Sequence, residues 1–142
     1  MNAHRTFFHK YFLLYRPFVS ELNRMLEVYQ LHNAQWSIMY YLDMYQSTSL
    51  VELSKHLYVE KPTITRTVMT LLKLEYVEQI PVSDKREKRI QLSERGKEVT
   101  AEIRKLLDEY EKKIMEGVSA EEQSLVIQVM DLVRNNIIEK GD

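Results

Sequence analysis

The sequence contains no cysteine and only three glycines and three prolines among its 142 residues. The lack of cysteine excludes a disulfide framework, thiolate zinc or iron–sulfur sites and thiol-based redox sensing. Scarce glycine and proline favour long elements with few turns. No apolar run approaches the roughly 20 residues that a membrane span needs, and the N-terminal apolar stretch lacks a signal-peptide cleavage site. We therefore expect a cytoplasmic chain with no membrane partner.

What is present is a globular composition with an uneven distribution of charge. Hydrophobic residues make up 44% and charged residues 29%, and the length suits about one domain. The formal net charge of −1 conceals a neutral segment 1–60, a segment 61–97 of net +4 and a segment 98–142 of net −5. A basic middle suggests a surface for a polyanion, although a block of +4 is common in any sequence.

Helical periodicity dominates the N-terminal third. Apolar residues recur at spacings of three and four from Phe7 to about Leu31, and Pro17 is expected either to kink this helix or to start a second one. Asn33 is a plausible N-cap for the next helix, predicted over 34–45. The segment 46–50 then breaks the pattern.

The middle of the chain combines two helices with a hairpin. Ser49 and Glu52 form a capping box that opens a short helix. Pro62 suits the first position of a helix over 61–74, whose apolar side opposes a polar, cationic side. Alternating apolar residues predict a β-hairpin with a charged tip over 77–92.

Two long helices are predicted after the hairpin. One runs from Ser93 to about Glu116 and ends at Gly117, and a capping box of Ser119 and Glu122 opens the last. The expected fold class is mainly α with a small β-hairpin wing, in the order of a winged helix-turn-helix. In that arrangement one helix fits the major groove of B-DNA and the wing reaches the neighbouring minor groove.

Three segments resemble the MarR-type (multiple antibiotic resistance) transcriptional regulators. Residues 31–36 resemble the segment that opens the family's second helix, and residues 50–66 resemble its third and recognition helices. Residues 84–96 resemble the wing signature D-x-R-x-x-x-(I/V)-x-L-(T/S)-x-x-G, the most specific of the three. The flanking helices extend the resemblance over essentially the whole chain, 1–142.

The resemblance implies a homodimeric transcriptional regulator without a cofactor. Residues 33–92 are expected to form the winged DNA-binding lobe, and residues 1–31 and 93–142 the dimerisation helices. Two lobes would then read a pseudo-palindromic double-stranded DNA operator at sites about 34 Å apart. The expected function is repression of nearby genes, relieved by a small-molecule effector. The alternative is a winged-helix dimer that binds protein without DNA, against which the intact basic wing argues.

The predicted DNA contacts lie on the recognition helix and the wing. Arg86 at the wing tip is expected to enter the minor groove, with Asp84 orienting it through a charge-assisted pair. The alternative is a solvated tip with a local ion pair. Further contacts to phosphates or base edges are expected from Lys61, Pro62, Thr63, Thr65, Arg66, Lys85, Lys88 and Arg89.

Two residues depart from the family pattern. Tyr58 stands where many members have glycine at the end of the third helix, and Glu60 stands where Ser, Asp or Asn often caps the recognition helix. Both the tightness of that turn and the capping are therefore open. The Glu60 carboxylate would also repel phosphate unless a cation pairs with it.

Aromatic residues suggest a second site. Trp36, Tyr40, Tyr41 and Tyr45 are expected either to pack in the core, the commoner role, or to line a pocket for a small aromatic ligand. The four histidines show no spacing specific for a metal, and no nucleophile motif or glycine-rich phosphate loop suggests an enzyme.

Overall fold

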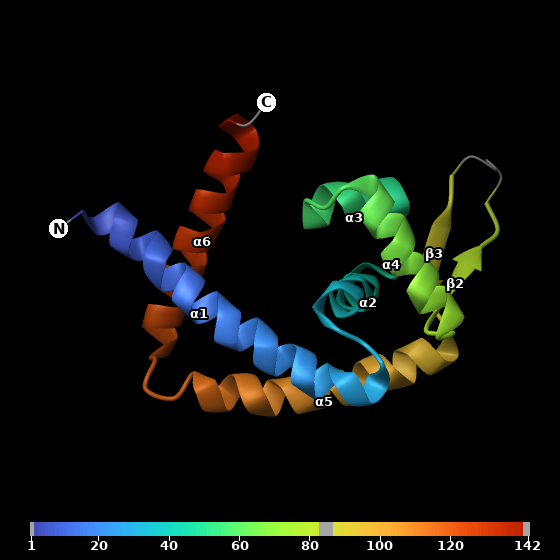
Figure 1. Ribbon diagram of the computed structural model, residues 1–142, viewed down its shortest axis with the longest axis horizontal. Helices are drawn as coiled ribbons and strands as arrows, with labels where there is room; N and C mark the ends of the chain where they lie inside the picture. Colours follow the sequence, from blue (N-terminus) through green and yellow to red (C-terminus); the bar gives the residue numbers. More distant parts are fainter. Residues whose placement is uncertain (1, 83–86, 141–142) are drawn as a thin grey trace. The chain divides into compact units, whose positions relative to one another are not determined.

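The computed structural model describes residues 2–82 and 87–140 and divides the chain into two compact units, residues 1–104 and 105–142 (Figure 1). The elements, in chain order, are α1 (Ala3–Leu26), the 3-10 helix η1 (Glu27–Tyr29), α2 (Asn33–Tyr45), β1 (Ser47–Ser49), α3 (Leu50–Leu57), α4 (Lys61–Lys73), β2 (Val77–Ile80), β3 (Arg89–Leu92), α5 (Glu94–Ile114) and α6 (Ala120–Lys140). The predicted class, mainly α with a small hairpin, is confirmed. None of the described helices is long and apolar enough to cross a membrane.

The antiparallel sheet contains one strand more than the predicted hairpin. β2 and β3 pair with Val77 opposite Leu92, which confirms the hairpin. β1 pairs with the other edge of β3, with Thr48 opposite Ile90, so the strand order is β1-β3-β2. The sequence pattern does not reveal β1, because Ser-Thr-Ser has no apolar alternation and its partner strand lies far along the chain.

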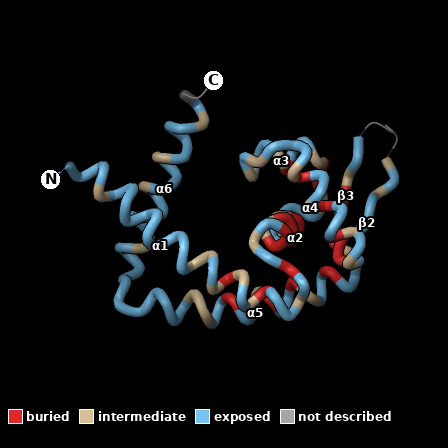
Figure 2. The backbone as a smooth tube through the Cα atoms, viewed as in Figure 1, coloured by how far each residue is buried: buried red, intermediate tan, exposed pale blue. Residues whose placement is uncertain are grey.

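Helices α2, α3 and α4 pack with the sheet around the core of the first unit. Met39 of α2, Leu53 of α3, Leu71 of α4 and Ile90 of β3 are fully buried. Burial of each such side chain stabilises the fold by about 1.5–3 kcal/mol before conformational entropy is subtracted. Figure 2 shows buried residues in α2, α4, the strands and the first part of α5, whereas most of α1 is exposed.

Two local expectations near the N-terminus need correction. α1 continues through Pro17, so this proline does not start a second helix. The N-cap of α2 is His32 and not Asn33, which is the first helical residue. The reason is that the His32 N–H donates to Gln35 Oε1 at 2.9 Å, while the Asn33 N–H donates to the side chain of Asn23 at 2.7 Å.

Several elements end at non-glycine residues with positive φ, which explains how a chain with few glycines makes its turns. Gln30, Gln46, Tyr58 and Glu75 have φ values between 57° and 74°. Gln30 ends η1, so the first helical segment stops before the predicted Leu31. A left-handed conformation costs an L-residue about 1–2 kcal/mol relative to glycine.

The start of α5 lies against the residue that precedes β2. The Ser93 N–H donates to the carbonyl of Tyr76 at 3.0 Å, and the Ser93 hydroxyl accepts the N–H of Gly96 at 3.0 Å. A Cβ at position 96 would lie 1.9 Å from that carbonyl oxygen. The glycine of the wing signature is therefore required here because only a residue without a Cβ permits this approach.

Candidate nucleic-acid interface

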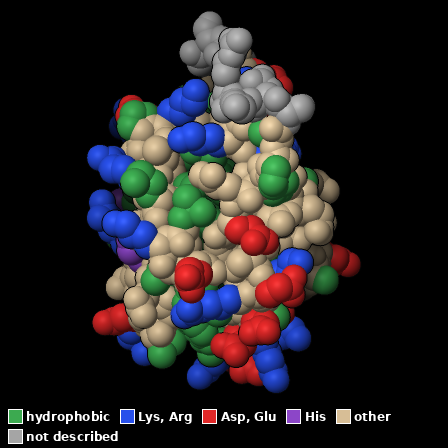
Figure 3. Space-filling model, turned by 90° about the vertical axis from the view of Figure 1, so that its right-hand side faces the viewer, with side chains coloured by type: hydrophobic (Ala, Val, Ile, Leu, Met, Phe, Trp, Pro, Cys, Tyr) green, Lys and Arg blue, Asp and Glu red, His purple; other side chains and the backbone are tan. Residues whose placement is uncertain are grey.

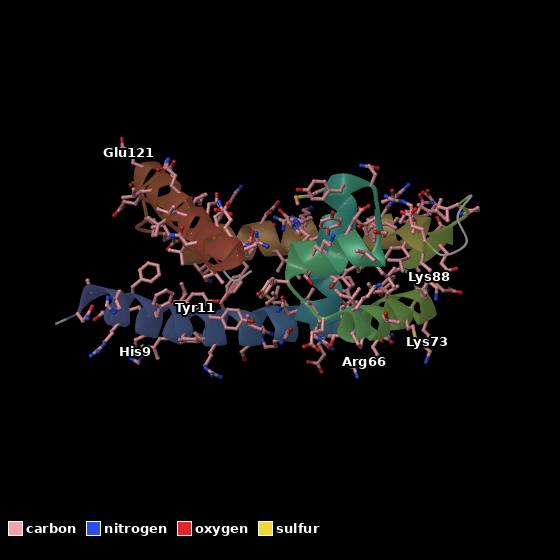
Figure 4. The ribbon with its side chains drawn as sticks, turned by 90° about the horizontal axis from the view of Figure 1, so that it is seen from above. His9, Tyr11, Arg66, Lys73, Lys88 and Glu121 are labelled. Atoms are coloured by element: carbon pink, nitrogen blue, oxygen red, sulfur yellow. The ribbon has the colours of Figure 1, made fainter. Side chains whose placement is uncertain are left out.

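Helix α4 presents a polar side because its apolar residues face the core. Ile64, Val68 and Leu71 recur at helical spacing and are all buried. Arg66 and Lys73 are exposed, and in Figure 4 both leave the helix on the same side. The amphipathic pattern predicted for residues 61–74 is confirmed, and it gives the molecule a cationic helix face.

The first turn of α4 has no side-chain cap. Glu60 precedes it in an extended conformation, and its side chain makes no capping hydrogen bond within the described part of the chain. Pro62 is the second helical residue, one later than predicted, and its missing N–H leaves no helical bond unmade there. The remaining N–H groups carry the positive end of the helix dipole, which favours an anion such as phosphate.

The polar side chains of α4 bond within the helix and still retain capacity for a ligand. The Thr65 hydroxyl donates to the Lys61 carbonyl at 3.0 Å, and Arg66 Nη2 donates to Thr63 Oγ1 at 3.3 Å. Across residues 2–82 and 87–140, no carboxylate forms an ion pair with Arg66. Its guanidinium therefore keeps N–H donors for an external acceptor.

An open groove of about 500 Å³ lies between the helix-turn-helix and the wing. Its lining residues come from the end of β1, the start of α3, α4 and the wing: Ser49, Leu50, Val51, Lys61, Thr65, Glu87 and Lys88. The structure thus brings three of the predicted contact residues, Lys61, Thr65 and Lys88, to one concave surface. The sequence did not indicate Leu50 and Val51 of α3 as lining residues, because their position beside the wing follows only from the tertiary fold.

Lysines of α4 and of the wing have no ion-pair partner among the described residues. Within the ranges that the structure describes, no ion pair engages Lys61, Lys73 or Lys88. Figure 3 shows Lys and Arg side chains gathered along one edge of the face that carries α4 and the strands. The predicted wing residues Asp84, Lys85 and Arg86 lie outside the described residues.

Arg89 at the start of β3 is bonded within the protein. Its Nη1 lies 3.2 Å from Glu52 Oε1 and 2.9 Å from Glu87 Oε1, and its Nη2 donates to Ser47 Oγ at 3.1 Å. The hydrogen bond from Arg89 lowers the pKa of the Glu52 carboxyl, and the bonds to Glu87 and Glu52 raise the pKa of Arg89. The sequence indicated Glu52 only as a capping residue, since its partner is distant in the chain.

The four aromatic residues of α2 fall into two groups. Trp36 is buried, and its ring centroid lies 6.1 Å from that of Tyr40, over which Arg104 places its guanidinium carbon at 5.1 Å. Tyr41 and Tyr45 instead pair at 4.6 Å. The second pair also contacts an unpredicted ring, His56 of α3, at 4.7 Å from Tyr41 and 5.9 Å from Tyr45.

Two helices, one in each unit, carry the longest series of exposed apolar side chains among the described helices. On the first half of α1 the exposed residues are Phe7, Phe8, Tyr11, Phe12, Leu13, Leu14 and Tyr15. On α6 they are Leu125, Val126, Ile127, Met130, Leu132 and Ile137. Exposed apolar side chains in such numbers are typical of a helix that another protein covers.

The sequence comparisons identify relatives among transcriptional regulators. The model of the MarR family matches residues 31–88, the segment that contains α2, α3, α4, β2 and part of the wing. An uncharacterized HTH-type transcriptional regulator of Staphylococcus aureus strain Mu50 is 26% identical over 140 residues, which cover 95% of this chain and 94% of the relative.

The structural comparisons agree in fold. Staphylococcus aureus MarR in complex with salicylate and kanamycin superposes with a TM-score of 0.86 at 23% identity, covering 96% of this chain and 93% of that one. The Staphylococcus aureus MepR–DNA complex superposes with a TM-score of 0.81 at 19% identity, covering 91% and 96%. At these identities the likeness shows a common fold.

Proposed function

We propose that this chain is a member of the MarR family, whose model matches residues 31–88, and a DNA-binding transcriptional regulator. In this proposal α4 enters the major groove and the wing contacts the adjacent minor groove. The observation that carries the proposal is the groove between α4 and the wing, which is lined by Lys61 and Lys88, two lysines without an ion-pair partner among the described residues. A helix of this width fits the major groove, and cationic side chains beside it neutralise phosphates. The DNA complex of the similarly folded MepR supports this arrangement.

The proposed contacts divide by chemistry. Lys61, Lys88 and the first-turn N–H groups of α4 would bind phosphates, while Arg66 with Thr63 and Thr65 would reach base edges or the backbone. At the wing tip, Arg86 oriented by Asp84 would enter the minor groove, with Lys85 on a phosphate. Pro62 would add an apolar contact beside the first turn.

A homodimer is the assembly that we propose. The exposed aromatic and leucine side chains of α1 would be covered by a second copy, and so would the apolar residues of α6. Residues 1–31 and 93–142 would then be dimerisation segments around the lobe 33–92. The two-fold symmetry of such a dimer matches a pseudo-palindromic operator.

Regulation by an effector belongs to the same proposal. The chain would repress neighbouring genes in the cytoplasm and be released by a small aromatic molecule. The salicylate complex of a similarly folded MarR protein supports this class of ligand. Trp36 and Tyr40 on one side, or Tyr41 and Tyr45 on the other, would supply the aromatic contacts.

Selection of duplexes from a random pool, followed by titration of the selected duplex, tests the proposal. We expect an inverted repeat, and binding that weakens steeply with salt. Arg66→Ala should weaken binding by about 10–100-fold through a lost base or phosphate contact. Lys88→Ala should lower the magnitude of the log–log salt slope by about one unit.

The control for these variants is Lys112→Ala, which removes an exposed positive charge from the far end of α5. Its affinity should match that of the unmodified chain. If all three substitutions weaken DNA binding equally, the effect reflects the net charge of the protein and not the position of the residue. If no duplex is enriched, the protein-binding alternative is favoured.

A further inference from the structure

The base of the wing contains a polar junction that the proposed DNA contacts do not use. Arg89 of β3 reaches a carboxylate on α3, a carboxylate in the wing and a hydroxyl on β1, through Glu52, Glu87 and Ser47. Only a quarter of the Arg89 side chain is exposed. Its planar guanidinium can satisfy several acceptors at once, which a lysine ammonium on the same stem does with less fixed geometry.

Glu52 is fixed at the other end of this junction. Its Oε2 accepts a hydrogen bond from the hydroxyl of Thr48 at 3.2 Å, and its N–H donates to Ser49 Oγ at 3.1 Å. Thr48 is fully buried and pairs with Ile90 across the β1–β3 ladder. The Glu52 carboxylate therefore connects the first turn of the helix-turn-helix to the sheet from which the wing projects.

The junction adjoins both walls of the groove described above. One wall is the start of α3, at Ser49, Leu50 and Val51, and the other includes Glu87 and Lys88. Glu52 lies one residue beyond the first wall and Arg89 one residue beyond the second. An ion pair between Glu52 and Arg89 therefore limits how far the two walls of the groove can move apart.

We propose that Glu52 and Arg89 form a clamp that holds the wing at a fixed distance from the helix-turn-helix, so that Arg89 is a positioning residue and Glu52 favours DNA binding despite its negative charge. The role in DNA binding rests on the proposed function. An isolated exposed ion pair would contribute little, but this pair shares a network with Ser47, Thr48 and Glu87 and is partly shielded.

The first test compares two carboxylates near the DNA-binding surface. By charge alone, both Glu52→Gln and Glu60→Gln should tighten binding of the duplex that the unmodified chain selects, since each removes repulsion from phosphate. The clamp predicts opposite signs: Glu52→Gln weakens binding about tenfold, whereas Glu60→Gln, which breaks no ion pair in the described structure, tightens it severalfold. Tightening by Glu52→Gln would overturn the positioning role.

Arg89 distinguishes positioning from direct phosphate contact. Arg89→Lys keeps the positive charge and so preserves a point-charge contact with phosphate, but loses the fork that joins three acceptors. The clamp predicts that Arg89→Lys binds as weakly as Arg89→Gln, and that adding Glu52→Gln to Arg89→Gln causes no further loss. Retention of affinity by Arg89→Lys, or full additivity of the two glutamine substitutions, would overturn it.

Hydrogen exchange on the DNA-free full chain tests the clamp without any operator. In Glu52→Gln and Arg89→Lys, amides of β1 and β3 should exchange about tenfold faster, while those of α2 and all amides of Glu60→Gln keep their rates. Unchanged exchange in β1 and β3 would overturn the clamp itself. If the unmodified chain enriches no duplex, the proposed function fails, and the role of the clamp in DNA binding fails with it. The hydrogen-exchange rates of β1 and β3 still decide whether the clamp itself exists.

Discussion

Tyr58 shows how one side chain can oppose the conformation that the fold requires. It caps α3 with φ at 57° and ψ at 49°, and its N–H donates to the Ser54 carbonyl. The Ser54 hydroxyl in turn donates to the Val59 carbonyl at 2.6 Å. The turn between α3 and α4 is therefore tight although it lacks the glycine common in the family, which answers the question that the sequence left open.

Replacement of this tyrosine should raise stability. Tyr58 is 72% exposed, so Tyr58→Gly loses little burial while it relieves a left-handed L-residue. We expect the free energy of unfolding to rise by about 1 kcal/mol and Tm by about 3 °C, measured by thermal denaturation. Tyr58→Ala is the control because it truncates the same side chain and keeps the strain; a rise of equal size in Tyr58→Ala would assign the effect to the ring.

Gly96 marks the opposite case, a position where a side chain has no space. In Gly96→Ala the new Cβ would meet the Tyr76 carbonyl, a backbone group that cannot move without disturbing the start of β2. We expect destabilisation of about 2–3 kcal/mol in denaturant unfolding. Gly117→Ala should cost only about 1 kcal/mol, because its φ of 88° strains an alanine while no atom lies within 4 Å of the added Cβ.

At the scale of the elements, local signals were predicted well. The capping box of Ser119 and Glu122 is confirmed, because the two residues bond reciprocally at 2.9 and 3.1 Å. At Ser49 the predicted bond from the Glu52 N–H to Oγ is present, but the Glu52 carboxylate bonds to Thr48 and Arg89. The amphipathic face of α4 also follows directly from its periodicity. These features depend on residues only three or four positions apart, so a short stretch of sequence contains both partners.

Features that depend on distant segments were not predicted. β1 exists because β3 supplies its hydrogen bonds, and the contact of Arg89 with Glu52 joins residues 37 positions apart. The groove likewise combines α3, α4 and the wing. The sequence identified Lys61, Thr65 and Lys88 as candidates by charge and position, but their common surface requires the tertiary fold.

At the scale of the whole molecule, α1 and α6 each carry a series of exposed apolar side chains of the kind that a partner commonly covers. If a second copy covers these helices, placing a carboxylate within either surface buries an unpaired charge. Phe12→Glu and Leu132→Glu should each weaken self-association by at least about 100-fold, measured by light scattering across a dilution series.

The matched control for these substitutions is Met44→Glu in α2. Met44 is 47% exposed and lies in the lobe 33–92, outside both proposed dimerisation segments, so the same charge should leave association unchanged. A monomeric unmodified chain at micromolar concentration would contradict the dimer, and equal dissociation by all three substitutions would indicate a general loss of folding.

Trp36 is the only tryptophan in the chain, and it is buried in α2 with 6% of its surface exposed, whereas Arg66 and Lys73 on the polar face of α4 are exposed. Intrinsic indole fluorescence of the whole protein therefore originates from one apolar environment and needs no attached dye. A duplex seated on α4 would not touch this ring. Any change in its emission on titration would consequently report a rearrangement transmitted through the core, and a silent spectrum would report rigid docking.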